Sequence, residues 1–155
     1  MKALTLHQPY ASLIAVGDKR VETRYWRTGY RGRLAIHAAK RPPYLGGITL
    51  ERLGAIFDSL NTMLLRTLPR GVVIATAELV ACVPVEKVDF DPDWHGNPAG
   101  LLHDPSDAEA IIASPLESYF GNYTPGRFAW LLRDVQPIEP VPARGQQGLW
   151  NWEAS

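Results

Sequence analysis

Three charged residues, Lys19, Glu22 and Arg24, have types and a spacing that suit chemistry on an anionic ligand. The segment around them predicts a turn followed by a strand, and residues i and i+2 of a strand face the same way. Glu22 and Arg24 should therefore share a face, with Lys19 at the turn, so that two cations flank one carboxylate. A lysine removed from water acts as a base or an electrostatic anchor. The alternative is a solvated cluster of surface ion pairs.

The residues that follow this trio combine arginines with aromatic rings. Trp26 and Tyr30 lie close to Arg31 and Arg33, and Arg127 follows a glycine as Arg31 precedes one. Aromatic rings stack on bases, arginines bind phosphate, and glycine lets the backbone approach a ligand. The pattern favours an anionic ligand that also stacks. Without a ligand, the ring at position 26 would close one end of a barrel, and the glycines would serve turns.

Charge is distributed unevenly along the chain, although its formal net charge is zero. Residues 1–41 hold nine of the 16 basic residues and two acidic ones, and the remainder holds 7 basic and 14 acidic residues. The acidic stretch at 86–109 argues against a broad surface for duplex nucleic acid. A short single strand of RNA or a nucleotide is the expected partner.

Two further polar residues are candidates for the same site. Glu78 lies inside the apolar run VVIATAELVACV, where an ionised carboxylate needs a partner or exposure. It is expected either to pair with Lys19 or Arg24 or to point outward. Gln8 precedes Pro9 at the start of a predicted helix, where free N–H groups suit an anion. Capping of that helix by a polar side chain is the alternative.

Periodicity predicts a strand-rich chain with few helices. Helices are expected from Pro9 through Val16, where Gly17 is a good stop, and over residues 48–66. We expect a surface loop over 86–109, one short helix near 106–113, and an extended connection stiffened by Pro137, Pro140 and Pro142. Strands are expected at 2–6, 20–26, 31–38, 71–85, 127–135 and 148–152. This order predicts an α+β fold: a small mixed β-barrel with two or three flanking helices.

The length and composition of the chain narrow the class of protein. A chain of 155 residues suits one domain, and no internal repeat is visible. One cysteine and no zinc-type spacing predict no disulfide, no metal and no cofactor. No signal peptide and no apolar run of membrane-spanning length are recognised, so we expect a cytoplasmic protein without a membrane partner.

Five segments together resemble an ASCH domain (activating signal cointegrator homology domain): LTLHQPYASLI, GDKRVETRYW, YRGRLAIHAAK, FGNYTPGRFAWLL and RGQQGLW. The most specific part is the motif Gly17-x-Lys19-x-x-Glu22-x-Arg24. The resemblance implies a single ASCH-like domain over 1–155, with variable insertions near 41–70 and 86–115. It also implies a PUA-like barrel whose cleft beside the first helix is lined by the motif, and RNA or other nucleic-acid binding.

Two branches of the family imply an enzymatic alternative. One is similar to an amidohydrolase that removes the acetyl group from N4-acetylcytidine with a lysine, a threonine three residues later and a glutamate on a later strand. Lys19 matches that lysine, Glu78 matches the glutamate, and Glu22 occupies the threonine position. Another branch is linked to cleavage of single-stranded RNA. Binding therefore stands beside hydrolysis, with Lys19, Glu22 and Glu78 as the candidate catalytic residues.

Overall fold

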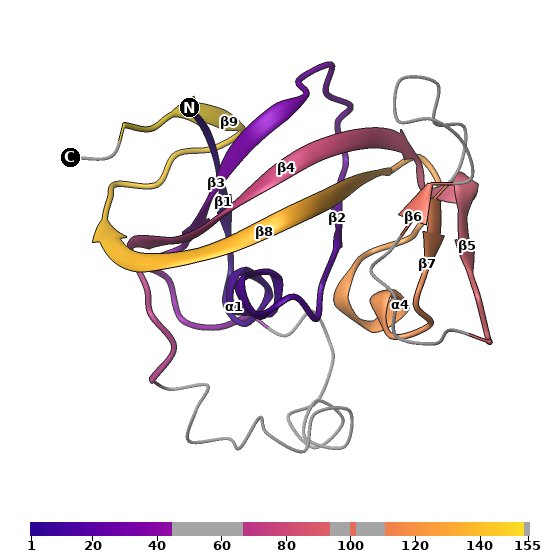
Figure 1. Cartoon of the computed structure of the whole chain (residues 1–155), viewed down its shortest axis with the longest axis horizontal. Helices are drawn as coiled ribbons and strands as arrows, with labels where there is room; N and C mark the ends of the chain where they lie inside the picture. The colour runs from indigo at the N-terminus through magenta and orange to yellow at the C-terminus, as the bar shows by residue number, and fades with distance from the viewer. Residues whose placement is uncertain (45–66, 94–99, 102–110, 154–155) are drawn as a thin grey trace. The chain divides into compact units, whose positions relative to one another are not determined.

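Most of the regular structure is β-strand, with short helices between the strands. The structure is a computed structural model that describes residues 1–44, 67–93, 100–101 and 111–153 (Figure 1). The predicted helix at 48–66 lies outside the described residues. The elements are β1 (Lys2–Leu6), α1 (Tyr10–Val16), β2 (Val21–Arg24), β3 (Gly32–Ala38), β4 (Val72–Pro84), η1 (Val85–Lys87), β5 (Val88–Phe90), β6 (Gly100–Leu101), β7 (Ile111–Ala113), α4 (Glu117–Phe120), β8 (Phe128–Pro142) and β9 (Leu149–Asn151).

The larger sheet has six strands in the order β2-β8-β4-β3-β1-β9. β1 runs parallel to β3, with Lys2 opposite Leu34, and antiparallel to β9. β2 runs antiparallel to β8. Parallel neighbours need a crossover connection, and α1 lies in the connection between β1 and β3. The mixed sheet with its flanking helices is the predicted α+β fold class.

The short helix α1 ends where the sequence predicts. Its apolar residues Ala11, Leu13 and Ile14 are buried, which gives the helix one packed face. Gly17 follows the last helical residue with φ of 93°, a backbone conformation that glycine adopts without steric cost.

The prediction of a loop over 86–109 and a helix near 106–113 is wrong for the described part of that stretch. β5, β6 and β7 form a second sheet in the order β5-β7-β6, and residues 111–113 of the predicted helix are β7. Val88 and Ile111 are buried, whereas Asp89 is exposed. This is strand alternation, but each strand is too short for its pattern to stand out among acidic residues and prolines.

The prediction of an extended connection beyond residue 135 is also wrong, because strand β8 continues to Pro142. β2 pairs only with residues 128–131 of β8, so the later part of β8 has no partner from β2. A proline lacks an N–H group and is tolerated where a strand edge is open. Pro137, Pro140 and Pro142 are all exposed, which fits this position.

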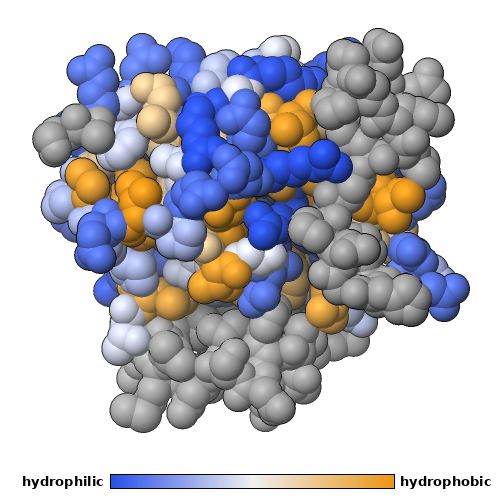
Figure 2. Space-filling view, in the orientation of Figure 1, coloured by the Kyte–Doolittle hydropathy of each residue, from blue (hydrophilic) through white to orange (hydrophobic). Residues whose placement is uncertain are grey.

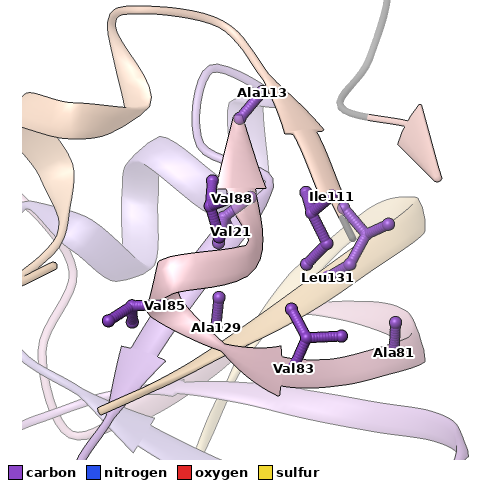
Figure 3. Packing of buried hydrophobic residues seen from close by; sticks show 9 residues of the cluster. All are labelled: Val21, Ala81, Val83, Val85, Val88, Ile111, Ala113, Ala129 and Leu131. Carbon is purple, nitrogen blue, oxygen red and sulfur yellow. The ribbon is translucent and has the colours of Figure 1, made fainter. Parts of the chain in front are cut away.

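The chain divides into two compact units, each with its own apolar cluster. The first unit comprises residues 1–16, 34–76 and 136–155, and the second comprises residues 17–33 and 77–135. Ala3, Ala35, Val73, Trp150 and Trp152 form the cluster of the first unit. The cluster of the second unit gathers residues of β2, β4, η1, β5, β7 and β8, among them Val21 and Leu131 (Figure 3).

Few large apolar side chains of the described ranges are exposed. On the face drawn in Figure 2, hydrophobic residues emerge in small patches between hydrophilic ones. Among the described residues the large apolar side chains with substantial exposure are Met1, Val16, Tyr25, Tyr44, Leu116 and Tyr119. No helix within these ranges has the length and apolar character needed to cross a membrane.

Candidate functional site

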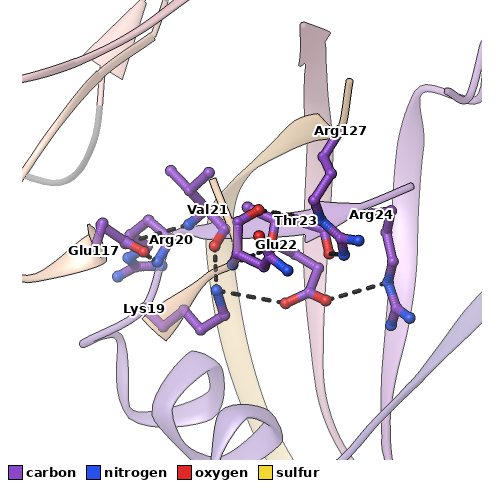
Figure 4. A network of polar contacts seen from close by, with 9 residues as sticks. Lys19, Arg20, Val21, Glu22, Thr23, Arg24, Glu117 and Arg127 are labelled. Atoms are coloured by element: carbon purple, nitrogen blue, oxygen red, sulfur yellow. Dashed lines mark hydrogen bonds and ion pairs between the residues drawn. The ribbon is translucent and has the colours of Figure 1, made fainter. Parts of the chain in front are cut away.

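The Glu22 carboxylate lies between two cations, as the spacing predicts. Glu22 Oε2 is 3.4 Å from Lys19 Nζ, and Glu22 Oε1 is 3.1 Å from Arg24 Nε (Figure 4). Lys19 Nζ also donates a hydrogen bond to the carbonyl oxygen of Val21. The side chain of Lys19 is fully buried, whereas those of Glu22 and Arg24 are 11% and 23% exposed. The ammonium therefore holds the carboxylate from the interior, and the guanidinium holds it from the solvent side.

The pairing of β2 with β8 places Glu22 and Arg24 on the face opposite the apolar cluster of the second unit. Val21 packs in the apolar cluster of the second unit, and the residues that follow it in β2 alternate in direction. Glu22 and Arg24 consequently share the opposite face, where Trp130 and Phe128 are their cross-strand neighbours. A four-residue strand thus places its apolar residue inward and its two charged residues together.

Glu117 belongs to this network, although the sequence did not single it out. Its Oε1 accepts hydrogen bonds from the backbone N–H groups of Arg20 and Val21, the latter at 3.2 Å. The residue is 2% exposed, and Oε2 has no hydrogen-bond partner in the described part of the chain. Burial raises the pKa of the Glu117 carboxyl, and the Lys19 ammonium and the two N–H groups oppose that rise.

Two aromatic residues lie against the network. Trp26 meets the fully buried Trp130 edge to face, with ring centroids 4.6 Å apart and an interplanar angle of 88°. This packing supports a partly exposed ring from behind. The hydroxyl of Tyr123 has no hydrogen-bond partner among the described residues. Burial, together with the charges of Glu117 and Glu22, raises the pKa of Tyr123.

Glu78 does not pair with Lys19. Its Oε1 lies near Gly32, 3.8 Å from the position that a Cβ atom would take there, and the Tyr30 hydroxyl is 3.7 Å from the same position. Glu78 is only partly buried, so the cost of removing its charge from water is smaller than for a fully buried carboxylate. Of the two carboxylates at positions 22 and 78, the structure brings the first to the buried ammonium.

The remaining predicted ligand residues of the second unit make contacts with the protein itself. The Tyr30 hydroxyl donates to the Arg33 carbonyl oxygen at 2.5 Å, and Arg33 Nη1 pairs with Asp134 Oδ2 at 2.6 Å. Arg31 Nη1 donates to the carbonyl oxygens of Thr28 and Tyr30. Arg127 donates to the carbonyl oxygens of Asn122 and Thr23, and so braces the strand that carries Glu22.

Gln8, in the first unit, caps α1. Its Oε1 accepts the backbone N–H of Ser12 at 3.1 Å, and its Nε2 donates to the carbonyl oxygen of Pro69 at 2.7 Å. The side chain is fully buried and both of its polar ends are occupied. This is the capping alternative, and it explains the residue without a ligand.

The described residues contain no group of three or more His, Cys, Asp and Glu side chains arranged to hold an ion. The arrangement instead offers hydrogen bonding and charge: a carboxylate fixed by two cations, beside aromatic rings and exposed arginines. Such a set can bind a polar, anionic molecule, and with a buried ammonium it can also stabilise developing charge.

Comparison with known proteins gives one family. A model of the ASCH domain matches residues 4–142. The human and the mouse protein called activating signal cointegrator 1 (Homo sapiens, Mus musculus) are each 36% identical over 81 residues, which is 52% of this chain and 14% of each relative. The chain therefore corresponds to a small part of these relatives.

Solved structures agree on the fold. The crystal structure of ASCH from Zymomonas mobilis has a TM-score of 0.51 at 20% identity, covering 98% of this chain and 87% of that one. A tyrosine-to-phenylalanine mutant of the same Zymomonas mobilis protein has a TM-score of 0.50 at 21% identity, covering 98% and 89%. The similarity confirms the predicted PUA-like fold. Since the family model spans most of the sequence, this chain belongs to the ASCH domain family.

Proposed function

We propose that this protein binds single-stranded RNA or a nucleotide through the surface around β2. We call this the arginine–aromatic surface, and it consists of Arg24, Tyr25, Trp26, Arg27 and Arg31. The observation that carries the proposal is that exposed or partly exposed arginines and aromatic rings occur together within residues 24–31. Tyr25 is 75% exposed, and the side chains of Arg27 and Arg31 are also exposed. Membership of the ASCH family, which is related to the RNA-binding PUA-like fold, supports the same class of ligand.

The residues of this surface divide into two roles. The arginines contact phosphate oxygens, which provides affinity without reading the base sequence. Tyr25 and Trp26 stack on bases, and Trp26 is rigid because Trp130 packs against it. Residues 17–33 contain six basic and two acidic residues, so this segment attracts a polyanion although the whole chain is neutral.

Glu22 supplies the polar contact that distinguishes one base from another. Its side chain is 11% exposed, and this small exposed part would meet the ligand while Lys19 and Arg24 hold the carboxylate in position. A carboxylate offers about four lone-pair directions, so two ion pairs leave capacity for a base amino group. The Lys19 ammonium itself lies beneath this surface and acts through Glu22.

Binding of a fluorescein-labelled RNA decamer, followed by anisotropy at several salt concentrations, tests the proposal. Three phosphate contacts on a single strand give a slope of about −2 for log K against log salt, or roughly a twentyfold loss of affinity between 50 and 200 mM salt. Arg24→Gln and Arg27→Gln should each weaken binding and lower that slope by about 0.7. Arg70→Gln, an exposed arginine of the other unit, is the matched control.

Two results would reject RNA binding at this surface. One is an affinity that does not change with salt. The other is equal affinity for Arg24→Gln, Arg27→Gln and the Arg70→Gln control, since the cations of the surface would then contribute nothing.

Hydrolysis of RNA or of an N4-acylated cytidine at the same place is the second candidate. The fully buried Lys19 ammonium favours it, because active sites hold ionisable groups away from water. In this scheme Glu22 takes a proton from the attacking water and passes it to the leaving group, the cytidine amine or the RNA 5′-oxygen, while Lys19 holds Glu22 in place. Either acetate release from N4-acetylcytidine or RNA cleavage should then occur with wild type and stop in Lys19→Met. The hydrolysis candidate is rejected if wild type shows no turnover, or if Lys19→Met is as active as wild type.

A further inference from the structure

The Glu117 carboxylate contacts the backbone that leads into the site. Glu117 is the first residue of α4, and its Oε1 accepts the N–H groups of both Arg20 and Val21. It lies 96 residues from Val21 in the sequence, and its side chain is almost fully buried. A buried carboxylate that accepts two backbone N–H groups is a strong, directional contact.

This contact covers an open edge of the sheet. β2 is the terminal strand in the sheet order, so the edge that faces away from β8 has no partner among the described strands. On the β8 side, Leu132 donates its N–H to the Arg20 carbonyl oxygen at 2.8 Å. Glu117 Oε1 accepts the N–H groups of Arg20 and of Val21, the first residue of β2, and an unpaired N–H at such a buried position would be costly. The backbone of Arg20 and Val21 is therefore held from two sides.

Val21 links Glu117 to the buried ammonium. The N–H of Val21 donates to Glu117, and its carbonyl oxygen accepts the hydrogen bond from Lys19 Nζ (Figure 4). Lys19 Nζ in turn lies 3.4 Å from Glu22 Oε2. The peptide groups flanking Val21 thus stand between the carboxylate of α4 and the ion pairs of the site.

We propose that Glu117 is a positioning residue for the site: by fixing the backbone of Arg20 and Val21 it holds the Val21 carbonyl where Lys19 binds it. Lys19 then keeps Glu22 in place beneath the arginine–aromatic surface. The consequence for RNA binding rests on the proposed function. The consequence for Lys19 does not, and it is measurable without a ligand.

Two conservative variants separate positioning from a plain effect of charge. Glu117→Gln keeps the accepting oxygen and loses the charge, and since Oε2 makes no hydrogen bond within the described residues, its replacement by NH2 breaks none there. Glu117→Asp keeps the charge but draws the oxygen back by about one bond length, some 1.5 Å. If Glu117 acts by positioning, Glu117→Gln should keep Lys19 bound to the Val21 carbonyl and Glu117→Asp should not. If only the charge of Glu117 matters, the two variants should behave the other way round.

NMR of protein labelled with 13C at the lysine ε-carbons shows whether the Lys19 side chain is held in its buried position. The sequence has four lysines, at 2, 19, 40 and 87, and Lys19→Met assigns the signal of the buried one. We expect a dispersed Lys19 signal in wild type and Glu117→Gln, and a signal shifted toward those of the other lysines in Glu117→Asp. Glu86→Gln and Glu86→Asp are matched controls, because Glu86 also accepts a backbone N–H, from Gly126 at 3.0 Å, but is exposed.

RNA affinity is the second readout. Glu117→Asp should weaken decamer binding roughly threefold to tenfold, the equivalent of one weakened hydrogen bond, while Glu117→Gln stays near wild type. In the Lys19→Met background, Glu117→Asp should add little, because a residue that acts through Lys19 has no further effect once the ammonium is gone. Equal effects in both backgrounds would mean a general structural role and would overturn the proposal.

The outcomes separate this inference from the proposed function. Two NMR results overturn the positioning role, whatever the RNA affinities are. One is a dispersed Lys19 signal in both Glu117 variants. The other is a Lys19 signal that loses its dispersion in Glu117→Gln but keeps it in Glu117→Asp. If Glu117→Asp does not fold, the Glu117→Gln arm decides alone, since loss of the Lys19 signal in that folded variant also overturns it. An NMR result as expected with no RNA binding by wild type leaves positioning standing and rejects RNA as the ligand.

Discussion

Replacing Glu22 by glutamine removes the negative charge that the buried Lys19 contacts, and we expect a large loss of stability. At the observed 3.4 Å and an effective dielectric constant of about 20, the attraction between the two charges is roughly 5 kcal/mol. The Lys19 side chain is fully buried, so water cannot replace the lost partner. The Glu117 carboxylate and the Val21 carbonyl still face the ammonium and offset part of the loss. We therefore expect Glu22→Gln to lower the free energy of unfolding by about 3 kcal/mol.

The arrangement predicts an asymmetry between the two partners. Lys19→Met removes the buried charge and keeps a long apolar side chain, and Glu22 retains Arg24 at 3.1 Å. We expect a loss of about 1 kcal/mol, because apolar replacement of a buried ion is often close to neutral. The double variant should be about 2 kcal/mol more stable than Glu22→Gln alone, since no uncompensated ammonium remains. Asp134→Asn is the control: it disrupts the Arg33 pair, whose side chains are 32% and 64% exposed, and should cost less than about 1 kcal/mol.

Urea unfolding at pH 7, followed by the fluorescence of the five tryptophans, measures these differences. The urea dependence of the free energy should stay the same across the variants, which shows that the midpoint shift reports stability. A Glu22→Gln variant within about 1 kcal/mol of wild type would refute the reasoning, because a buried ammonium would then not depend on its carboxylate. A double variant that loses the sum of the two single effects would refute it as well.

Three further results are expected elsewhere in the chain. Gly145→Ala should lower the melting temperature, because its Cβ would clash with the His37 ring, whereas Gly29→Ala, with nothing within 4 Å in the described structure, should change it little. Burial lowers the pKa of His37, so the unfolded chain takes up a proton there at a higher pH than the folded chain does. Urea unfolding should therefore show the full stability contribution of His37 above about pH 6.5 and a progressive loss below it. This loss should be absent in His37→Gln. Tyr123→Phe should be neutral or stabilising in thermal unfolding, because its buried hydroxyl has no partner within the described residues.

Elements that depend on local pattern were predictable from the sequence. β1, β3, β4 and β9 coincide with the predicted strands within a residue or two, because each has enough alternating or β-branched residues to show its period. The arrangement of Lys19, Glu22 and Arg24 was predictable for the same reason, since it needs only a turn and the parity of a four-residue strand.

Features that depend on distant partners were not predictable. The strand character of residues 111–113 appears only when they pair with β5 and β6, and the prolines of β8 are tolerated only because β2 is too short to pair beside them. The sequence left Glu78 either paired with Lys19 or Arg24 or pointing outward; a pair with Lys19 would have balanced the charge, but so does Glu22, three residues from Lys19. Charge balance alone cannot choose between two carboxylates, and the nearer one costs less chain entropy to bring into contact.

Glu117 shows why a motif of consecutive residues does not define this site on its own. The charged residues that form it lie at positions 19–24, yet the backbone between them is held by the side chain of Glu117 and by the N–H of Leu132. Nothing in the segment SPLESYF marks its acid as buried, because the burial arises from a strand edge nearly a hundred residues away. A chain could therefore keep the motif intact and still lose the geometry of its ion pairs through a change in α4, since the carbonyl that binds Lys19 belongs to a residue whose N–H is held there.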